Sequence, residues 1–218
     1  MDFLRPAALR EVGARAARPD ATPEIVVVGA SREAARAAAM FLVGLPEAFE
    51  LPLVLVIGGD AEEHGDLCVS LQAHCALPVR QIDDKDPILA GRIQLAPADY
   101  HLLVERGSFA LSTEGAVNGA RPSLDVLLES VADVFGASAI CVLLGMTRRA
   151  DGSIDGRVGA ASVRARGGLV IVQDPLTAAA GAAADPASIP AATMLHLSEI
   201  APFVSRLSRL SLADAEAP

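Results

Sequence analysis

The sequence predicts an α/β fold, a doubly wound and mostly parallel sheet with an antiparallel hairpin insertion near its middle. Continuous apolar runs rich in β-branched residues alternate with Ala-rich segments of helical spacing, which is typical of βα units in a Rossmann-like three-layer arrangement. The length of 218 residues suits one domain. The composition is 52% hydrophobic but only 3% aromatic, so Ala, Val, Leu and Ile must fill the core.

The first half of the chain carries the clearest βα signal. Residues 24–29 (EIVVVG) form an apolar run that ends in glycine, as expected for a strand buried on both faces. The spacing then predicts, in order, a helix at 32–43, a strand at 52–57, a helix at 65–76 and a strand at 78–82. Residues 1–23 have little periodicity, and we expect them to be a lead-in to the domain.

The middle of the chain changes rhythm and then returns to alternation. Three short strand-like pieces at 92–96, 101–104 and 109–113 are separated by turns and predict antiparallel hairpins. A helix at 123–135 follows, with Ser123 as its N-cap and Gly136 as its C-cap. The remaining predicted elements are a strand at 139–144, a helix at 156–166, strands at 169–173 and 194–197, and a helix ending near 210. The domain is thus expected to span 24–210, with a solvated tail at 211–218.

Charge and composition exclude several classes of partner. The formal charge is 18 − 27 = −9 and the sequence pI is about 4.9, so neither nucleic acid nor an anionic membrane surface is expected to bind. The longest apolar stretches, 51–57 and 137–144, are far shorter than a membrane-spanning helix, and the Arg- and Ala-rich start lacks the apolar core of a secretory signal. Three cysteines without a C-x-x-C pair predict no disulfide framework and no structural zinc. We therefore expect a cytoplasmic location.

In a sheet of this kind the chemistry-bearing groups lie in loops beyond the carboxyl ends of the strands. After the first strand, Ser31 follows Gly29 and Ala30 at a tight strand-to-helix turn. A serine there can act as a nucleophile, or it can simply cap the next helix. A dinucleotide site at Gly29 is disfavoured because Arg32 and Glu33 stand where the fingerprint needs glycine, so no cofactor is expected.

Longer strings point to one family. They are VVVGAS (26–31), ALPV (76–79), LAPADYHLLV (95–104), VNGARPSLDVLL (117–128), LLGM (143–146), DGxxG (155–159), GGLVIVQD (167–174) and LHLSEI (195–200). In this order they resemble the catalytic, C-terminal domain of the chemotaxis protein-glutamate methylesterases, the CheB family. The resemblance covers roughly residues 24–208. It implies hydrolysis of glutamyl methyl esters on chemoreceptors, with a chemoreceptor or another chemosensory protein as partner.

The resemblance also implies a triad, of which this sequence keeps only part. In the family a serine in a GASTGG loop attacks the ester, a histidine in a QHMP loop takes its proton, and an aspartate in a GMG-x-DG loop orients the ring. The serine is present as Ser31, but the histidine position falls on Gly58. Asp155 matches the aspartate by counting back from the GG that follows, and Asp151 is a second candidate. Removing one member of a triad lowers turnover by several powers of ten.

Other residues have more than one interpretation. The resemblance makes the backbone amide of Met146 an oxyanion donor. Asn118 and Arg121 either line the rim of the cleft or stabilise the loop before the helix at 123–135. His64 lies six residues beyond Gly58, so it is either an exposed histidine at a helix start or a relocated base. No pair of histidines with a carboxylate has the spacing of metal ligands.

We therefore expect a diverged methylesterase domain with impaired or no esterase activity that acts as a binding or regulatory module. The alternative is a working serine-type methylesterase in which Ser31 uses a base such as His64. Only about 23 residues precede the first strand, too few for the receiver domain that the resemblance would place there, so activation is expected to come from a partner. The sequence leaves the oligomeric state open.

Overall fold

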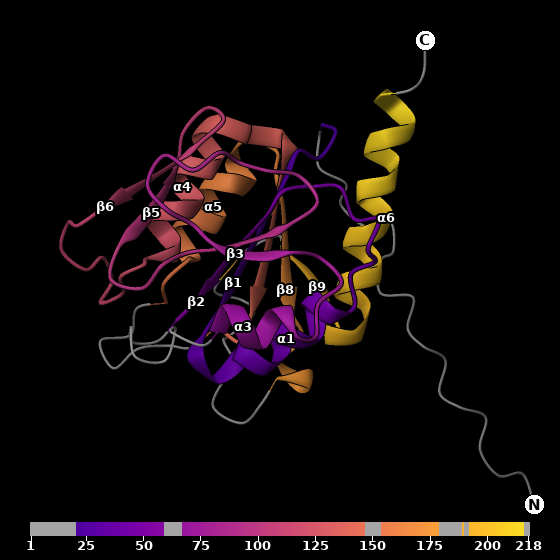
Figure 1. Ribbon diagram of the computed structural model, residues 1–218, viewed down its shortest axis with the longest axis horizontal. Coiled ribbons are helices and arrows are strands. Elements are labelled where there is room, and N and C mark those ends of the chain that lie inside the picture. Colours follow the sequence, from indigo (N-terminus) through magenta and orange to yellow (C-terminus); the bar gives the residue numbers. More distant parts are fainter. Residues whose placement is uncertain (1–20, 59–66, 147–153, 179–188, 190–191, 216–218) are drawn as a thin grey trace, which may run out of the picture.

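The computed structural model describes residues 21–58, 67–146, 154–178, 189 and 192–215 (Figure 1). The principal sheet has seven strands in the order β3-β4-β2-β1-β7-β8-β9, and every neighbouring pair is parallel. Its strands are β1 (Ile25–Ala30), β2 (Leu53–Ile57), β3 (Val79–Gln81), β4 (Ile93–Leu95), β7 (Ala139–Leu144), β8 (Leu169–Gln173) and β9 (Thr193–Leu195). The predicted fold class is confirmed.

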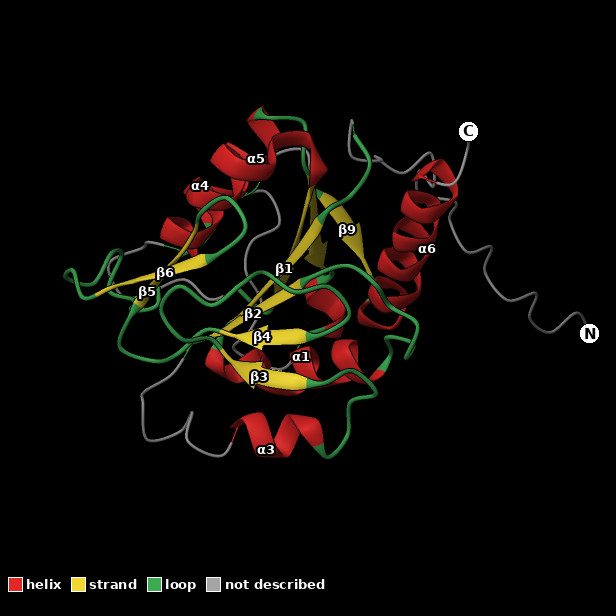
Figure 2. Cartoon of the chain, turned by 45° about the horizontal axis from the view of Figure 1, so that its top comes forward, coloured by secondary structure: helices red, strands yellow, loops and turns green. Residues whose placement is uncertain are grey.

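Helices cover both faces of this sheet (Figures 1 and 2). The helices are α1 (Ala35–Val43), α3 (Leu67–Gln72), α4 (Leu124–Phe135), α5 (Arg157–Ala165) and α6 (Leu197–Ala215), with short 3-10 turns η1 (Arg32–Ala34), η2 (Gly136–Ser138) and η3 (Pro175–Thr177). One hydrophobic cluster joins the sheet to α1, α3 and α6, and a second joins its other face to α4 and α5. Among the described residues, no helix is long and apolar enough to cross a membrane.

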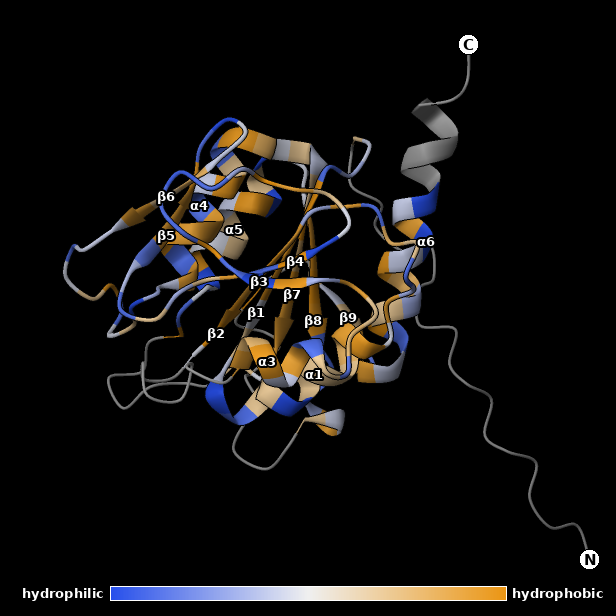
Figure 3. Ribbon diagram, viewed as in Figure 1, coloured by the Kyte–Doolittle hydropathy of each residue, from blue (hydrophilic) through white to orange (hydrophobic). Residues whose placement is uncertain are grey.

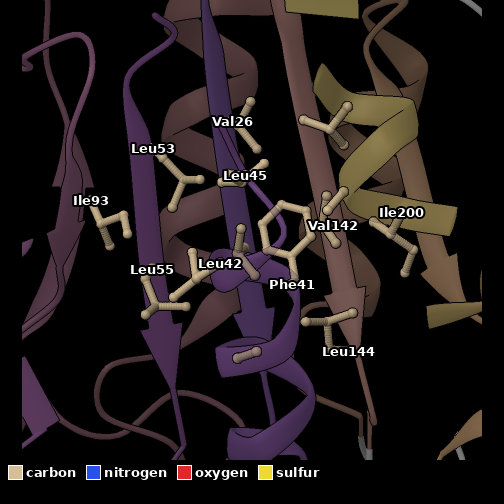
Figure 4. Packing of buried hydrophobic residues seen from close by; sticks show 14 of the residues in the cluster. Val26, Phe41, Leu42, Leu45, Leu53, Leu55, Ile93, Val142, Leu144 and Ile200 are labelled. Carbon is tan, nitrogen blue, oxygen red and sulfur yellow. The ribbon is translucent and has the colours of Figure 1, made fainter. Parts of the chain in front are cut away.

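Alternation along β1 explains why its whole sequence is apolar. Val26 and Val28 pack into the cluster on the α1 side, whereas Ile25 and Val27 pack into the cluster on the α4 side. Successive side chains of a strand point to opposite faces, so a strand covered on both faces needs apolar residues at every position. Figure 3 shows the apolar colouring of these central strands, and Figure 4 shows Val26 in the same cluster as Phe41 of α1.

The predicted hairpin insertion is smaller than the sequence suggested. Only β5 (His101–Val104) and β6 (Phe109–Ser112) pair antiparallel, whereas β4 lies in the main sheet, parallel to both β2 and β3. The expectation that residues 92–96 belong to the hairpins was therefore wrong. The three residues of β4 are all buried, and the Gln94 side chain is satisfied there by the Leu89 amide and the Pro87 carbonyl at 2.8 and 2.9 Å.

Most of the other predicted elements are present with small differences at their ends. The strands predicted at 139–144 and 169–173 match β7 and β8 residue for residue. The last helix runs to Ala215, past the expected end near residue 210. Gly136 ends α4 with a φ of 51°, and its amide donates to the Ala132 carbonyl, as expected of a C-cap.

The register of the central strands brings three loops together at one edge. Ala30 lies opposite Ile57 of β2 on one side and opposite Leu144 of β7 on the other. Beyond these positions the Gly58 amide still donates to the Ala30 carbonyl at 2.9 Å, and the Ser31 amide donates to the Leu144 carbonyl at 3.3 Å. The residues that follow β1, β2 and β7 are therefore held side by side.

Candidate functional site

A small pocket lies at the carboxyl ends of β1, β2 and β7. Its cavity volume is about 80 Å³, and it is lined by Ala30, Ser31, Val56, Gly58, Ala120, Pro122, Leu124, Met146 and Asp155. Four positions that the sequence singled out, namely Ser31, Gly58, Met146 and Asp155, thus share one pocket. Most of the other lining residues are apolar.

Ser31 occupies the N-cap position of η1 without capping it. The side chain makes no capping hydrogen bond, and its Oγ is buried and has no hydrogen-bond partner among the described residues. Its backbone is extended, with φ of −68° and ψ of 165°. The hydroxyl therefore lies at the pocket without a hydrogen-bond partner among the described residues, which leaves it available to a ligand.

Gly58 follows β2 directly and lies against the backbone of the Ser31 loop. A Cβ at this position would be 3.5 Å from the Arg32 amide nitrogen and 3.8 Å from the Ser31 Cα, which are ordinary van der Waals distances. Gly58 does not have a positive φ. Position 58 could therefore carry a side chain, and that side chain would begin beside the serine.

Asp155 is engaged with the start of α4. Its Oδ1 accepts hydrogen bonds from the Ser123 hydroxyl at 2.7 Å and the Asp125 amide at 3.1 Å, and its Oδ2 accepts from the Leu124 amide at 2.8 Å. Three donors thus bind the carboxylate at a helix N-terminus, where negative charge is favoured. Partial burial nevertheless raises the pKa of Asp155, because these hydrogen bonds only partly offset the loss of solvation.

Ser123 lies at the N-cap position of α4 as predicted, but its side chain does not cap the helix. Ser123 is the N-cap residue of α4 by position, but its side chain makes no capping bond and donates to Asp155 instead. Its amide donates to Nδ1 of the buried His101 at 3.2 Å, and the His101 Nε2 lies 2.9 Å from the Gly115 carbonyl oxygen. This arrangement assigns the ring proton to Nε2. His101 therefore connects the β5–β6 hairpin to the helix start that holds Asp155.

Asn118 and Arg121 lie in the loop that leads to α4. The Asn118 amide donates to Asp125 Oδ2 at 2.7 Å, and its φ of 50° is a left-handed conformation that asparagine tolerates. The Arg121 guanidinium donates to the Thr113 and Glu114 carbonyls at 3.4 and 3.3 Å. Ala120 and Pro122, which flank Arg121, line the pocket. Both polar side chains thus hold the loop whose backbone forms one wall.

Two predicted candidates, His64 and Asp151, lie outside the described residues. Met146, expected to offer its amide to an oxyanion, is buried and lines the pocket. The sequence reasoning missed the part that Ser123 and His101 play in holding Asp155. The only available signal was that His101 falls in the HLLV string and Ser123 in the RPS string.

The described residues contain no group of three His, Cys, Asp or Glu side chains that could hold a metal ion. All three cysteines are free, and burial raises the pKa of Cys141 far above its usual range. The polar side chains among the lining residues of the pocket are those of Ser31 and Asp155.

The chain is therefore a doubly wound α/β domain in which a serine at the turn after the first strand and an aspartate from a later loop share a pocket at the carboxyl ends of the strands. The family model described as CheB methylesterase matches residues 26–204, and the chain belongs to this family.

Curated relatives and a solved structure support the same family membership. A Pseudomonas aeruginosa protein named protein-glutamate methylesterase/protein-glutamine glutaminase 3 is 36% identical over 191 residues, which cover 86% of this chain and 55% of that protein. A Leptospira interrogans protein named for the same two activities is 35% identical over 156 residues, covering 71% and 78%. The crystal structure of the Thermotoga maritima CheB methylesterase catalytic domain superposes with a TM-score of 0.75 at 27% identity, covering 87% of this chain and all of that one.

Proposed function

We propose that this chain is a CheB-type methylesterase domain of a chemosensory pathway that has little or no esterase turnover and acts as a binding or regulatory module. Its ligand would be the modified glutamyl or glutamine side chain of a receptor segment, since the relatives are named for both activities. One observation carries the proposal: at position 58, where a side chain would start beside Ser31, the residue is glycine.

The Ser31 hydroxyl must lose its proton when it attacks an ester. A serine is a weak nucleophile at neutral pH unless a neighbouring base takes this proton. No described residue accepts a hydrogen bond from Ser31 Oγ. The loss of one triad member lowers turnover by roughly 10⁴ to 10⁶-fold, because its members act as a unit.

Asp155 does not replace the base. Two α4 amides and the Ser123 hydroxyl already bind its carboxylate. These contacts are those of a group that fixes a helix start and one wall of the pocket. Together with the buried hydroxyl they support binding of a small side chain, and they do not supply a route for the proton.

The test is methanol release from a methylated chemoreceptor, with ammonia release from the amidated receptor as the second activity. We expect no release above that of the Ser31→Ala variant, together with retained binding of the receptor segment in a pull-down or by calorimetry. Turnover that disappears in Ser31→Ala would contradict the proposal and would establish a working esterase. In that case His64→Ala would show whether this histidine is the base.

A further inference from the structure

His101 is a buried histidine that does not line the pocket but binds two segments that do. It begins β5 and is 2% exposed. The Ser123 amide donates to its Nδ1 at 3.2 Å, and its Nε2 lies 2.9 Å from the Gly115 carbonyl oxygen. Gly115 lies in the loop that runs to Ala120, and Ser123 directly precedes Leu124; both Ala120 and Leu124 are lining residues. The ring therefore joins two segments of the pocket wall.

The two partners select one chemical form of this ring. An amide N–H can only donate, so Nδ1 must offer its lone pair to Ser123. A carbonyl oxygen can only accept, so Nε2 must carry the proton that faces Gly115. The opposite tautomer would place two donors together at Nδ1 and two acceptors together at Nε2. His101 is therefore fixed as the neutral ring with its proton on Nε2.

The residue that His101 binds is also a donor to Asp155. Ser123 is fully buried, and its hydroxyl donates to Asp155 Oδ1 at 2.7 Å while its amide donates to His101. The amides of the next two residues, Leu124 and Asp125, are the other two described donors to this carboxylate. Because three consecutive residues bind Asp155, a shift of the backbone at Ser123 would move all three donors.

A second contact attaches the β5–β6 hairpin to α4 and offers a comparison. The Val104 amide of β5 donates to the Ser130 Oγ at 2.9 Å, and this hydroxyl donates to a carbonyl of α4 at 2.7 Å. Ser130 lies about two helical turns beyond Ser123, so its contact does not involve the donors to Asp155. A role in attaching the hairpin and a role in placing Asp155 can therefore be separated by mutation.

We propose that His101 is a positioning residue: acting through Ser123, it fixes where the Asp155 carboxylate lies in the pocket. Without the Nδ1 acceptor the buried Ser123 amide loses this hydrogen bond, and the start of α4 gains freedom to shift. This role goes beyond the proposed function, because it concerns the geometry of the pocket whether a bound side chain is only held or is also hydrolysed. A group outside the pocket thus determines the placement of one of its two polar side chains.

The experiment is an NMR titration of the Asp155 side-chain carboxyl in the full chain. Desolvation raises the pKa of this group, the three donors at the start of α4 lower it, and the charge of Asp125 raises it. His101→Leu removes the acceptor for the Ser123 amide and keeps an apolar side chain of similar size. We expect the donors to loosen and the pKa of Asp155 to shift further upward. In the parent protein, the nitrogen signals of the His101 ring should show a protonated Nε2 and an unprotonated Nδ1 at neutral pH.

Two amide substitutions separate the two contacts of the ring. In His101→Asn the side-chain oxygen can take the place of Nδ1 and accept from Ser123, but the side chain is too short to reach Gly115. In His101→Gln the side-chain nitrogen can take the place of Nε2 and donate to Gly115, but the acceptor at the Nδ1 position is lost. We expect His101→Asn to restore the parent pKa of Asp155, whereas His101→Gln should show the same upward shift as His101→Leu.

Ser130→Ala is the matched control for the attachment of the hairpin. It removes the Val104 contact and leaves His101 and Ser123 in place. We expect it to lower the melting temperature by several degrees and to leave the pKa of Asp155 at the parent value. Melting curves accompany every variant, and if His101→Leu does not fold, the comparison of His101→Asn with His101→Gln decides.

The proposal is overturned if the pKa of Asp155 stays at the parent value or falls in His101→Gln and His101→Leu. It is also overturned if Ser130→Ala shifts this pKa as much as they do, or if the ring carries its proton on Nδ1. His101 would then only attach the hairpin to α4. The proposed function is tested separately by methanol release, and a failure there does not alter the outcome of the carboxyl titration.

Discussion

Asp155 binds the start of α4, the helix that contains Asp125, and Asp125 binds the start of α5, the helix that follows Asp155 in the chain. Asp155 Oδ1 accepts the Asp125 amide of α4 at 3.1 Å, and Asp125 Oδ1 accepts the Gly159 amide of α5 at 2.7 Å. At Gly159 the two helices approach so closely that a Cβ would lie 2.5 Å from the Leu128 Cβ. The carboxylate at the pocket is therefore also part of the packing between α4 and α5.

Asp155→Ala should destabilise the fold by about 1–3 kcal/mol, because it leaves donors at the start of α4 without an acceptor. Urea unfolding followed by circular dichroism measures the change. Asp133→Ala is the matched control, since Asp133 is an exposed carboxylate that pairs with Arg166. Its loss should cost no more than about 1 kcal/mol. Equal effects of the two variants would show that Asp155 is not a structural group.

The stability of the protein should depend on pH through Asp155. Desolvation raises its folded-state pKa above 3.8, the ordinary value for an aspartate. Between the unfolded and folded pKa values the folded state binds more protons, so this group's contribution is fully present below about pH 3.8 and is lost as pH rises through the folded pKa.

The measurement is the free energy of unfolding of the parent protein minus that of Asp155→Asn, taken from acidic pH upward. We expect the difference to fall with rising pH in this window and to be flat above it. A difference that grows with pH would mean that the folded pKa of Asp155 is depressed.

The sheet could be predicted from the sequence because parallel strands that are buried on both faces have continuous apolar sequences. The runs in β1, β2, β7 and β8 needed no tertiary information, and the parallel direction expected of βα units places the loops that follow them at one edge of the sheet. The strand β4 could not be placed, since Ile93–Leu95 is too short to distinguish a hairpin strand from an inner parallel strand. The motif strings indicated Ser31 and Asp155 as candidates, and the structure places both in the lining of one pocket.

The partners of Asp155 could not be predicted. They depend on contacts with residues about 30 positions away in the chain, such as Ser123 and Leu124. No local pattern encodes such a contact. A motif locates an aspartate at the pocket, but the spacing of residues does not show which donors occupy its oxygens.

Gly29→Ala should destabilise the protein by about 1–3 kcal/mol through overpacking. A Cβ on Gly29 would lie 2.2 Å from the Leu124 Cδ2, and Leu124 cannot easily move because it also packs against Gly156. Gly115→Ala is the control, because a Cβ there meets nothing within 4 Å. Thermal melting should therefore separate the two variants by several degrees. Equal melting temperatures would show that Leu124 can move to accommodate a Cβ, and that close packing between α4 and β1 does not require glycine at position 29.

Gly58→His should convert the domain into a slow esterase. A side chain at position 58 starts 3.8 Å from the Ser31 Cα without a steric conflict, and Asp155 lines the same pocket. A positioned general base contributes roughly 10² to 10⁴-fold, and we expect the lower end because the native pocket carries no side chain at position 58. Methanol release from methylated receptor is the measurement. Gly58→Asn has a similar size but supplies no base, and the double variant Gly58→His with Ser31→Ala removes the nucleophile; both should remain inactive. If Gly58→His folds and binds receptor but releases no more methanol than Gly58→Asn, the glycine at position 58 is not what limits turnover.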